Sequence, residues 1–166
     1  MQALYNVTGS DLNVGEPDQA TLLEWKRLHA ASCEYLIKLN IIHQKGEEVL
    51  MFAKEFNELM VELVVACPED TDFKMKYAIS GNYMGEAYRL NGNMQEALMY
   101  YTQAYEITRQ LTIAYNNYYE FVTGLVVALE KLGNWFITAD DFEHALKAYE
   151  EQYAIVKNYM TMIPRI

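Results

Sequence analysis

The amino-acid sequence predicts an all-α domain of six helices, paired into three antiparallel hairpins that stack on one another. Three observations predict this class. Apolar residues recur at the three- and four-residue spacing of a helix face through long segments. Glycine and proline, 8 and 3 of the 166 residues, are too scarce for a turn-rich β-sandwich. The pattern also repeats along the chain, which is typical of stacked arrays.

The predicted fold occupies most of the chain. Residues 1–17 are polar and show no sustained apolar period, which predicts a flexible N-terminal segment. We expect the helical domain to cover residues 18–166. Its three hairpins are predicted over residues 18–66, 72–115 and 117–162.

The first predicted helix covers residues 18–43 and ends at the break formed by Lys45 and Gly46. Its apolar residues recur at helical spacing, so we expect them to form the face that packs against the domain. That face consists of Leu22, Trp25, Leu28, Cys33, Leu36, Leu39 and Ile42.

Five further helices follow at short intervals. They are predicted over residues 47–66, 72–91, 94–115, 117–138 and 141–162. Pro68 ends the second helix, Asn91 and Gly92 end the third, and the sixth ends before Pro164, because these residues disfavour helix continuation. Short side chains with an oxygen acceptor suit the helix starts, where backbone N–H groups are unpaired. The expected N-caps are Asp72, Asn93 and Asp141.

One pattern recurs three times along the chain. Val49, Ala97 and Ala145 occupy equivalent positions at intervals of 48 residues. The equivalent residues nine positions upstream are Asn40, Tyr88 and Phe136. Three positions before those lie Ile37, Gly85 and Gly133. Because the period runs through both helices of every pair, each pair is predicted to be one unit of an array.

These units resemble the tetratricopeptide repeat, whose pattern is W-x2-L-G-x2-Y followed by A-x3-F. The second unit carries Gly81, Met84, Gly85, Tyr88, Ala97 and Tyr101 at the pattern positions. The third unit carries Leu129, Leu132, Gly133, Phe136, Ala145 and Tyr149. The first unit is degenerate and carries Cys33, Leu36, Ile37, Asn40, Val49 and Ala53. Since the period exceeds the usual 34 residues, the chain is similar to the long-helix variety found in bacterial signalling proteins.

The resemblance implies a right-handed superhelix in which the two helices of each hairpin cross closely. Gly85, Gly133, Ala97 and Ala145 mark the predicted crossings. A larger side chain at these positions would push the helix axes apart and leave voids. We therefore interpret these residues, and the aromatic residues around them, as structural.

In this family the first helix of each pair lines the concave surface, which implies a partner-binding groove. The family's groove positions fall on Glu34, Lys38, Asn82, Glu86, Arg89, Glu130 and Asn134. Members that clamp a peptide carboxylate carry basic or amide groups where this chain has Glu34 and Glu130, so we expect no such clamp. Tyr35 and Tyr83 share a register with Lys131 and lie either in the groove or in the core.

The charge of the chain narrows the choice of partner. With 13 Lys and Arg against 23 Asp and Glu, the net charge is -10. This balance disfavours binding to nucleic acid or to an anionic membrane. The expected partner is a protein or peptide whose binding segment is basic or amphipathic.

Motifs for catalysis are missing from the sequence. It contains no Gly-rich phosphate loop, no Gly-x-Ser-x-Gly elbow and no His-Glu-x-x-His pair. His29 and Cys33 have the spacing of two metal ligands on one helix face, but no neighbouring motif supplies the other ligands of a tetrahedral site. We therefore expect no catalytic residue, no cofactor and no metal.

The sequence also suggests a compartment. No run of 18 apolar residues occurs, and the first residues lack the basic and apolar regions of a signal peptide. Cys33 and Cys67 lie among apolar residues and are expected to be buried free thiols. These features predict a cytoplasmic chain that does not cross a membrane.

The last predicted helix has two apolar rows. One row, formed by Phe142, Ala145, Tyr149, Val156 and Met160, is expected to pack on its own hairpin. The other row, formed by Ala148, Ile155, Tyr159 and Met162, has no obvious neighbour. It is interpreted as the contact with further repeats, as a homodimer surface of the C-terminal helix, or as partly exposed apolar surface.

The sequence thus favours a non-catalytic module that binds a peptide or helix of a partner protein in its groove. A second interpretation is the sensor or oligomerisation domain of a bacterial regulator, in which a ligand changes the superhelix. A third, a helical-bundle enzyme, lacks the constellations of residues that catalysis needs.

Overall fold

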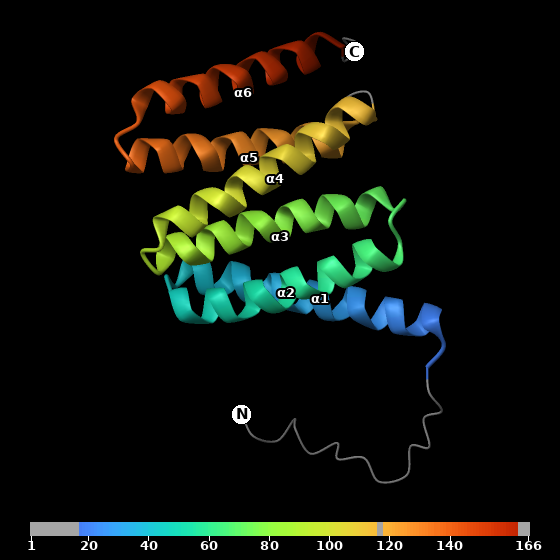
Figure 1. Ribbon diagram of the computed structural model, residues 1–166. Coiled ribbons are helices and arrows are strands. Elements are labelled where there is room, and N and C mark those ends of the chain that lie inside the picture. The colour runs from blue at the N-terminus through green and yellow to red at the C-terminus, as the bar shows by residue number, and fades with distance from the viewer. Residues whose placement is uncertain (1–16, 116–117, 163–166) are drawn as a thin grey trace.

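The computed structural model describes residues 17–115 and 118–162 (Figure 1). This part of the chain forms six α-helices and no strand. The helices are α1 (Gln19–Ile42), α2 (Gly46–Ala66), α3 (Thr71–Leu90), α4 (Met94–Ala114), α5 (Tyr119–Thr138) and α6 (Phe142–Met162). The predicted all-α class is confirmed. The N-terminal segment expected to be flexible, 1–17, lies outside the described residues except for its last residue.

The helices form three antiparallel hairpins stacked along one direction, α1 with α2, α3 with α4 and α5 with α6 (Figure 1). Each helix packs on the next one in the chain, and α3 also contacts α5. This arrangement is the predicted stack of hairpins. The first helices of the pairs, α1, α3 and α5, therefore share one side of the stack.

The turns inside the three hairpins have the same geometry. Gln44, Gly92 and Asp140 adopt positive φ angles of 54°, 79° and 57°, and they are 48 residues apart. In each turn the next backbone N–H donates to a carbonyl five residues earlier, as from Lys45 to Asn40 at 3.0 Å. The degenerate first unit therefore closes its hairpin as the other two units do.

The helix starts agree in part with the expected caps. Asp141 accepts a hydrogen bond from the backbone N–H of His144 at 3.2 Å. The expectation for Asp72 is wrong, because Asp70 is the N-cap of α3 and accepts from Asp72 and Phe73. Asn93 occupies the N-cap position of α4, but its side chain makes no capping hydrogen bond.

The small residues lie where the helices of a hairpin cross, as predicted. A β-carbon added at Gly133 would lie 2.6 Å from the ring of Tyr149. In the first unit the large and the small side chain of the crossing change places. Ile37 stands where the other units have glycine, and Ala53 stands where they have tyrosine. Both residues are fully buried. The exchange of volume across the crossing keeps the core filled without the consensus residues.

The face that α1 buries differs from the predicted one. The core-facing residues are Ala30, Cys33 and Ile37, whereas most of the predicted apolar face is exposed. The exposed members are Leu22, Trp25, Leu28, Leu36, Leu39 and Ile42. Helix α1 has two apolar faces, and spacing alone does not tell which of them meets a neighbour.

The assignment of the two rows on α6 was wrong in part, although Ala145 is buried and Tyr149 lies against Gly133 as predicted. Ala148 is buried against Leu125 and Leu129 of α5, and Ile155 packs on the same cluster. Tyr159 contacts Tyr119 with ring centroids 6.2 Å apart. The row predicted to lack a neighbour thus packs on its own hairpin, although its last member, Met162, is exposed. The outward residues are Phe142, Leu146, Tyr153, Val156 and Met160.

Helix α5 is the most apolar helix of the described residues. By length and composition it is apolar enough to cross a membrane. However, α5 packs on α4 and α6, and Phe121, Leu125 and Leu129 are buried there. The core of the stack thus uses part of its apolar surface, while Val127 and Ile137 are exposed. Of the two free cysteines, Cys33 is buried as expected and Cys67 is half-buried.

Candidate functional site

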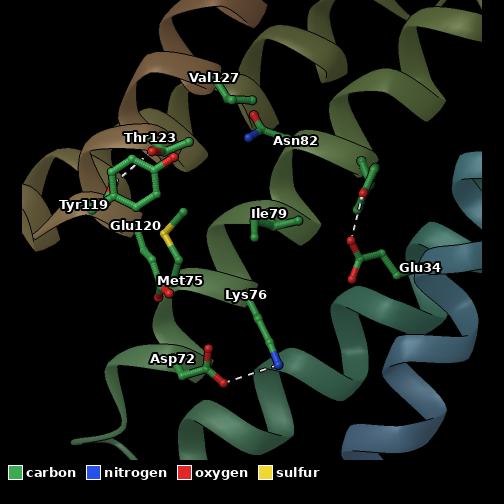
Figure 2. A pocket seen from close by; sticks show the side chains of 12 residues that line it. Glu34, Asp72, Met75, Lys76, Ile79, Asn82, Tyr119, Glu120, Thr123 and Val127 are labelled. Atoms are coloured by element: carbon green, nitrogen blue, oxygen red, sulfur yellow. Dashed lines mark hydrogen bonds and ion pairs between the residues drawn. The ribbon is translucent and has the colours of Figure 1, made fainter. Parts of the chain in front are cut away.

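A pocket of about 410 Å³ lies on the side of the stack formed by α1, α3 and α5 (Figure 2). We call it the groove pocket. Helix α1 contributes Glu34, and the other lining residues come from α3 and α5. They are Asp72, Met75, Lys76, Ile79, Asn82 and Tyr83 of α3 and Tyr119, Glu120, Thr123, Gly124 and Val127 of α5.

The floor of the groove pocket is apolar. Met75, Ile79 and Val127 line it at helical spacing on α3 and α5. Gly124 allows the close approach of these helices, because a β-carbon there would collide with the terminal methyl group of Met75. A residue without a side chain at position 124 therefore keeps the floor open beside Met75.

Asn82 supplies a polar group at one end of this floor, beside Val127 in Figure 2. Only 8% of the residue is exposed. Its Oδ1 atom is buried and accepts no hydrogen bond from the residues that the structure describes. An unsatisfied buried acceptor is costly. Asn82 is thus a group for which a bound ligand could provide the missing donor.

The rim of the groove pocket is acidic. Glu34, Asp72 and Glu120 border it, together with a single cation, Lys76. The Lys76 ammonium lies 3.3 Å from the Asp72 carboxylate, so its charge is offset within the pocket. Glu120 has no ion-pair partner among residues 17–115 and 118–162. The electrostatic potential at the opening therefore favours a cation.

Glu34 is fixed in place by two neighbours. The Tyr83 hydroxyl donates to its carboxylate at 3.0 Å, and the Lys38 ammonium lies 2.6 Å from it. Burial raises the pKa of the Tyr83 hydroxyl, and the charge of Glu34 raises it further. Tyr83 stays protonated at neutral pH and acts as the donor that connects α1 with α3.

A second pocket of about 260 Å³ lies next along α3. It is lined by Glu86, Arg89, Tyr101, Lys131, Asn134 and Thr138, and we call it the Glu86 pocket. Glu86 and Asn82 are four residues apart on α3, a rise of about 6 Å. The two pockets therefore follow each other along one face of this helix.

Glu86 is the centre of a buried charge network. Arg89 contacts its carboxylate at 2.6 Å, and Lys131 of α5 lies 3.7 Å away. The Tyr101 hydroxyl of α4 donates to it at 2.9 Å. Burial by itself would raise the pKa of Glu86, but the Arg89 hydrogen bond, the charge of Lys131 and the Tyr101 hydrogen bond lower it overall. Glu86 therefore stays ionised and connects α3, α4 and α5.

The structure divides the seven residues of the predicted groove into three groups. Glu34 and Asn82 line the groove pocket. Glu86, Arg89 and Asn134 line the Glu86 pocket. Lys38 and Glu130 are exposed and line neither pocket. Asn134 also accepts a hydrogen bond from the Tyr149 hydroxyl at 2.8 Å.

Sequence reasoning missed the apolar floor. Met75, Ile79 and Val127 were not among the predicted site residues, because apolar residues at helical spacing are read as core. Tyr35, Tyr83 and Lys131 were not assigned to either the groove or the core from the sequence. In the structure Tyr83 lines the groove pocket and Lys131 lines the Glu86 pocket. Tyr35 is exposed, and the Lys38 ammonium lies 5.9 Å from the centre of its ring.

His29, Cys33 and Glu55 come together between α1 and α2, with ligand atoms within 4.8 Å of one another. His29 and Glu55 already pair at 2.9 Å. Burial, and then the nearby Glu55 carboxylate, raise the pKa of the Cys33 thiol to about 11, so the thiolate that a metal needs is disfavoured. The contact of His29 with Glu55 beside a buried thiol accounts for this cluster.

Comparison with known families identifies the second hairpin. Residues 84–115 match the model of the tetratricopeptide repeat. The match covers the last seven residues of α3 and all of α4, where Gly85, Tyr88, Ala97 and Tyr101 carry the family pattern. A comparison with curated proteins gave no match. Residues 84–115 are thus similar to a tetratricopeptide repeat, and they lie in an all-α stack of helical hairpins.

Proposed function

We propose that the chain is a non-catalytic protein-interaction module whose groove pocket binds an apolar side chain from a basic or amphipathic segment of a partner protein. Repeat arrays of this kind use their extended surfaces to bind other proteins. The observation that carries the proposal is the combination of an apolar floor, an acidic rim and an unsatisfied buried amide in one pocket.

Each part of the groove pocket has a role in this proposal. The floor formed by Met75, Ile79 and Val127 buries the apolar anchor, which is the main source of affinity in such sites. Glu120 on the rim attracts basic residues next to the anchor, and Glu34, which is shared with Lys38, contributes less. The Asn82 amide pairs with a backbone N–H or side-chain donor of the segment.

The Glu86 pocket extends the proposed contact surface. A peptide or helix that follows α3 passes from the groove pocket to Arg89, Asn134 and Lys131. Arg89 is held by Glu86, so only part of its charge is offered to a partner. We expect substitutions here to weaken binding less than substitutions on the floor of the groove pocket.

The proposal is tested by selecting ligands from a random peptide library with the purified chain as bait. Peptides that bind are expected to combine an apolar anchor with Lys or Arg. Titration of the best peptide against the Ile79→Asp and Val127→Asp variants should show a loss of affinity of at least about tenfold, since an introduced carboxylate opposes burial of the anchor.

Val65→Asp is the matched control. Val65 is an exposed apolar residue of α2 that lines neither pocket, so the same substitution there should leave affinity unchanged. Selection of acidic peptides, or equal binding by the wild-type chain and both floor variants, would contradict the proposal.

A further inference from the structure

Both ends of the helix stack expose apolar faces. The α1 face consists of Trp25, Leu28, Leu36 and Leu39. The α6 face consists of Leu146, Tyr153, Val156 and Met160. Terminal units of repeat arrays normally present polar outer surfaces, and apolar side chains gathered on one face mark an interaction site.

Two positions of the α1 face, those of Trp25 and Leu36, are buried in the other two units. Trp25 is 64% exposed, whereas its equivalents at intervals of 48 residues, Phe73 and Phe121, are 4% and 5% exposed. Leu36 likewise remains exposed, while its equivalents in α3 and α5 are buried. In the interior, these positions pack against the second helix of the preceding unit. The α1 face thus has the shape and chemistry of a surface that receives such a helix.

Two positions of the α6 face are buried in α4, and the other two are half-buried there. Val156 is 42% exposed and its equivalent Thr108 is fully buried. Met160 is 66% exposed and its equivalent Thr112 is 6% exposed. The side of α4 that carries these positions packs against α5, the first helix of the next unit. The α6 face therefore presents the positions that in α4 meet the first helix of the next unit.

The α4–α5 contact shows how the two faces fit each other. Leu98 of α4 packs in one cluster with Leu132 and Trp135 of α5. Leu146 on the α6 face is the equivalent of Leu98. Leu36 and Leu39 on the α1 face are the equivalents of Leu132 and Trp135. The chain therefore carries both halves of its own internal interface, one at each end.

We propose that the α6 face of one copy docks on the α1 face of a second copy, in the arrangement that α4 and α5 adopt inside the chain. The occupant of each face is thus this same chain. Such a contact joins two different surfaces and leaves one face free at each end of the assembly, so it extends head to tail rather than closing as a symmetric pair. The side with the groove pocket stays open along the assembly.

The test is sedimentation velocity across a concentration series with the full chain and two single variants. Trp25→Glu places a charge in the α1 face and should prevent docking there. Leu146→Glu does the same for the α6 face. The wild-type chain should exceed the 19.3 kDa of a monomer and pass beyond a dimer as concentration rises. Each variant alone should stay monomeric, because each retains only one working face. An equimolar mixture of the two should form a dimer and grow no further.

Ile113→Glu is the control, since Ile113 is exposed on α4 outside both faces, and it should assemble like the wild-type chain. Tyr153→Glu is a second α6-face variant in case Leu146→Glu fails to fold, as judged by circular dichroism. A wild-type chain that stays monomeric throughout would overturn the proposal. So would a dimer that survives Trp25→Glu but not Leu146→Glu, because it would show that two α6 faces pair with each other.

Discussion

The ring of Tyr101 lies so close to Gly85 that a β-carbon added at residue 85 would collide with it. Tyr101 is almost fully buried, and its hydroxyl is held by Glu86, so the ring has no free space into which to move. The same contact recurs 48 residues later between Gly133 and Tyr149. The closest approach of two helices is thus fixed by one glycine and one tyrosine in each of these units.

Gly85→Ala is expected to destabilise the fold by about 1–3 kcal/mol, the usual cost of overpacking a core. In an exposed helix the same substitution would stabilise the helix by about 1 kcal/mol. A decrease in the free energy of unfolding would therefore be evidence of the collision with Tyr101. The free energy of unfolding from urea denaturation measures it.

Gly81→Ala is the matched control for this substitution. Its added β-carbon would lie 3.4 Å from the side chain of Ala104, an ordinary contact. We expect the free energy of unfolding of this variant to stay equal or rise. If both variants were equally stable, the crossing would not depend on Gly85.

Glu86→Gln should lower the free energy of unfolding by about 1.5–3 kcal/mol at neutral pH, because it weakens charged hydrogen bonds to a buried group. The pKa of Glu86 is lowered in the folded chain from its ordinary value of 4.5. Its contribution is therefore fully present above pH 4.5 and is lost as the pH falls through the lowered pKa. The stability difference between wild type and variant should shrink in acid.

Glu143→Gln serves as the comparison, since Glu143 pairs with Lys147 at the exposed surface. Such pairs contribute little, so stability at neutral pH should not change measurably. If the free energy of unfolding of Glu86→Gln fell in acid just as that of the wild-type chain does, Glu86 would not be the buried, ionised carboxylate described above.

Asn82→Leu is expected to weaken ligand binding in the groove pocket without lowering the stability of the fold. Removing a buried acceptor without a partner should leave the free energy of unfolding unchanged or raise it by about 1 kcal/mol. The same substitution should weaken binding of a groove-pocket ligand, because the amide is lost. Thermal unfolding and peptide titration on one preparation measure both effects.

Asn134→Leu should act in the opposite direction on stability. Asn134 accepts a hydrogen bond from Tyr149, and its loss should cost about 0.5–1.5 kcal/mol. A destabilised Asn82→Leu variant would mean that Asn82 has a partner in the free protein.

Tyr105 should ionise late in an alkaline titration. Burial raises the pKa of its hydroxyl to about 12, and the hydrogen bond to Glu151 adds to the shift. The resulting stability is fully present below the ordinary pKa of 10.0 and is lost as the pH rises through about 12. Tyrosinate absorbance should show one late-ionising group fewer in Tyr105→Phe than in the wild-type chain.

The sequence by itself determined the hairpins of the fold. The period of 48 residues and the helix-breaking residues predicted six helices and their pairing, because local backbone preferences act within a few residues. The close crossings at Gly85 and Gly133 followed from the same pattern. Even the degenerate first unit was placed in register by its spacing.

Only the tertiary structure decided which apolar face of a helix is used. Helices α1 and α6 each carry two such faces, and the neighbour that buries one of them is set by packing between segments distant in sequence. For the same reason Met75, Ile79 and Val127 could not be told from core residues until α3 and α5 were placed beside each other. Two partners of the Glu86 carboxylate, Lys131 of α5 and the Tyr101 hydroxyl of α4, likewise reach it only in the folded chain.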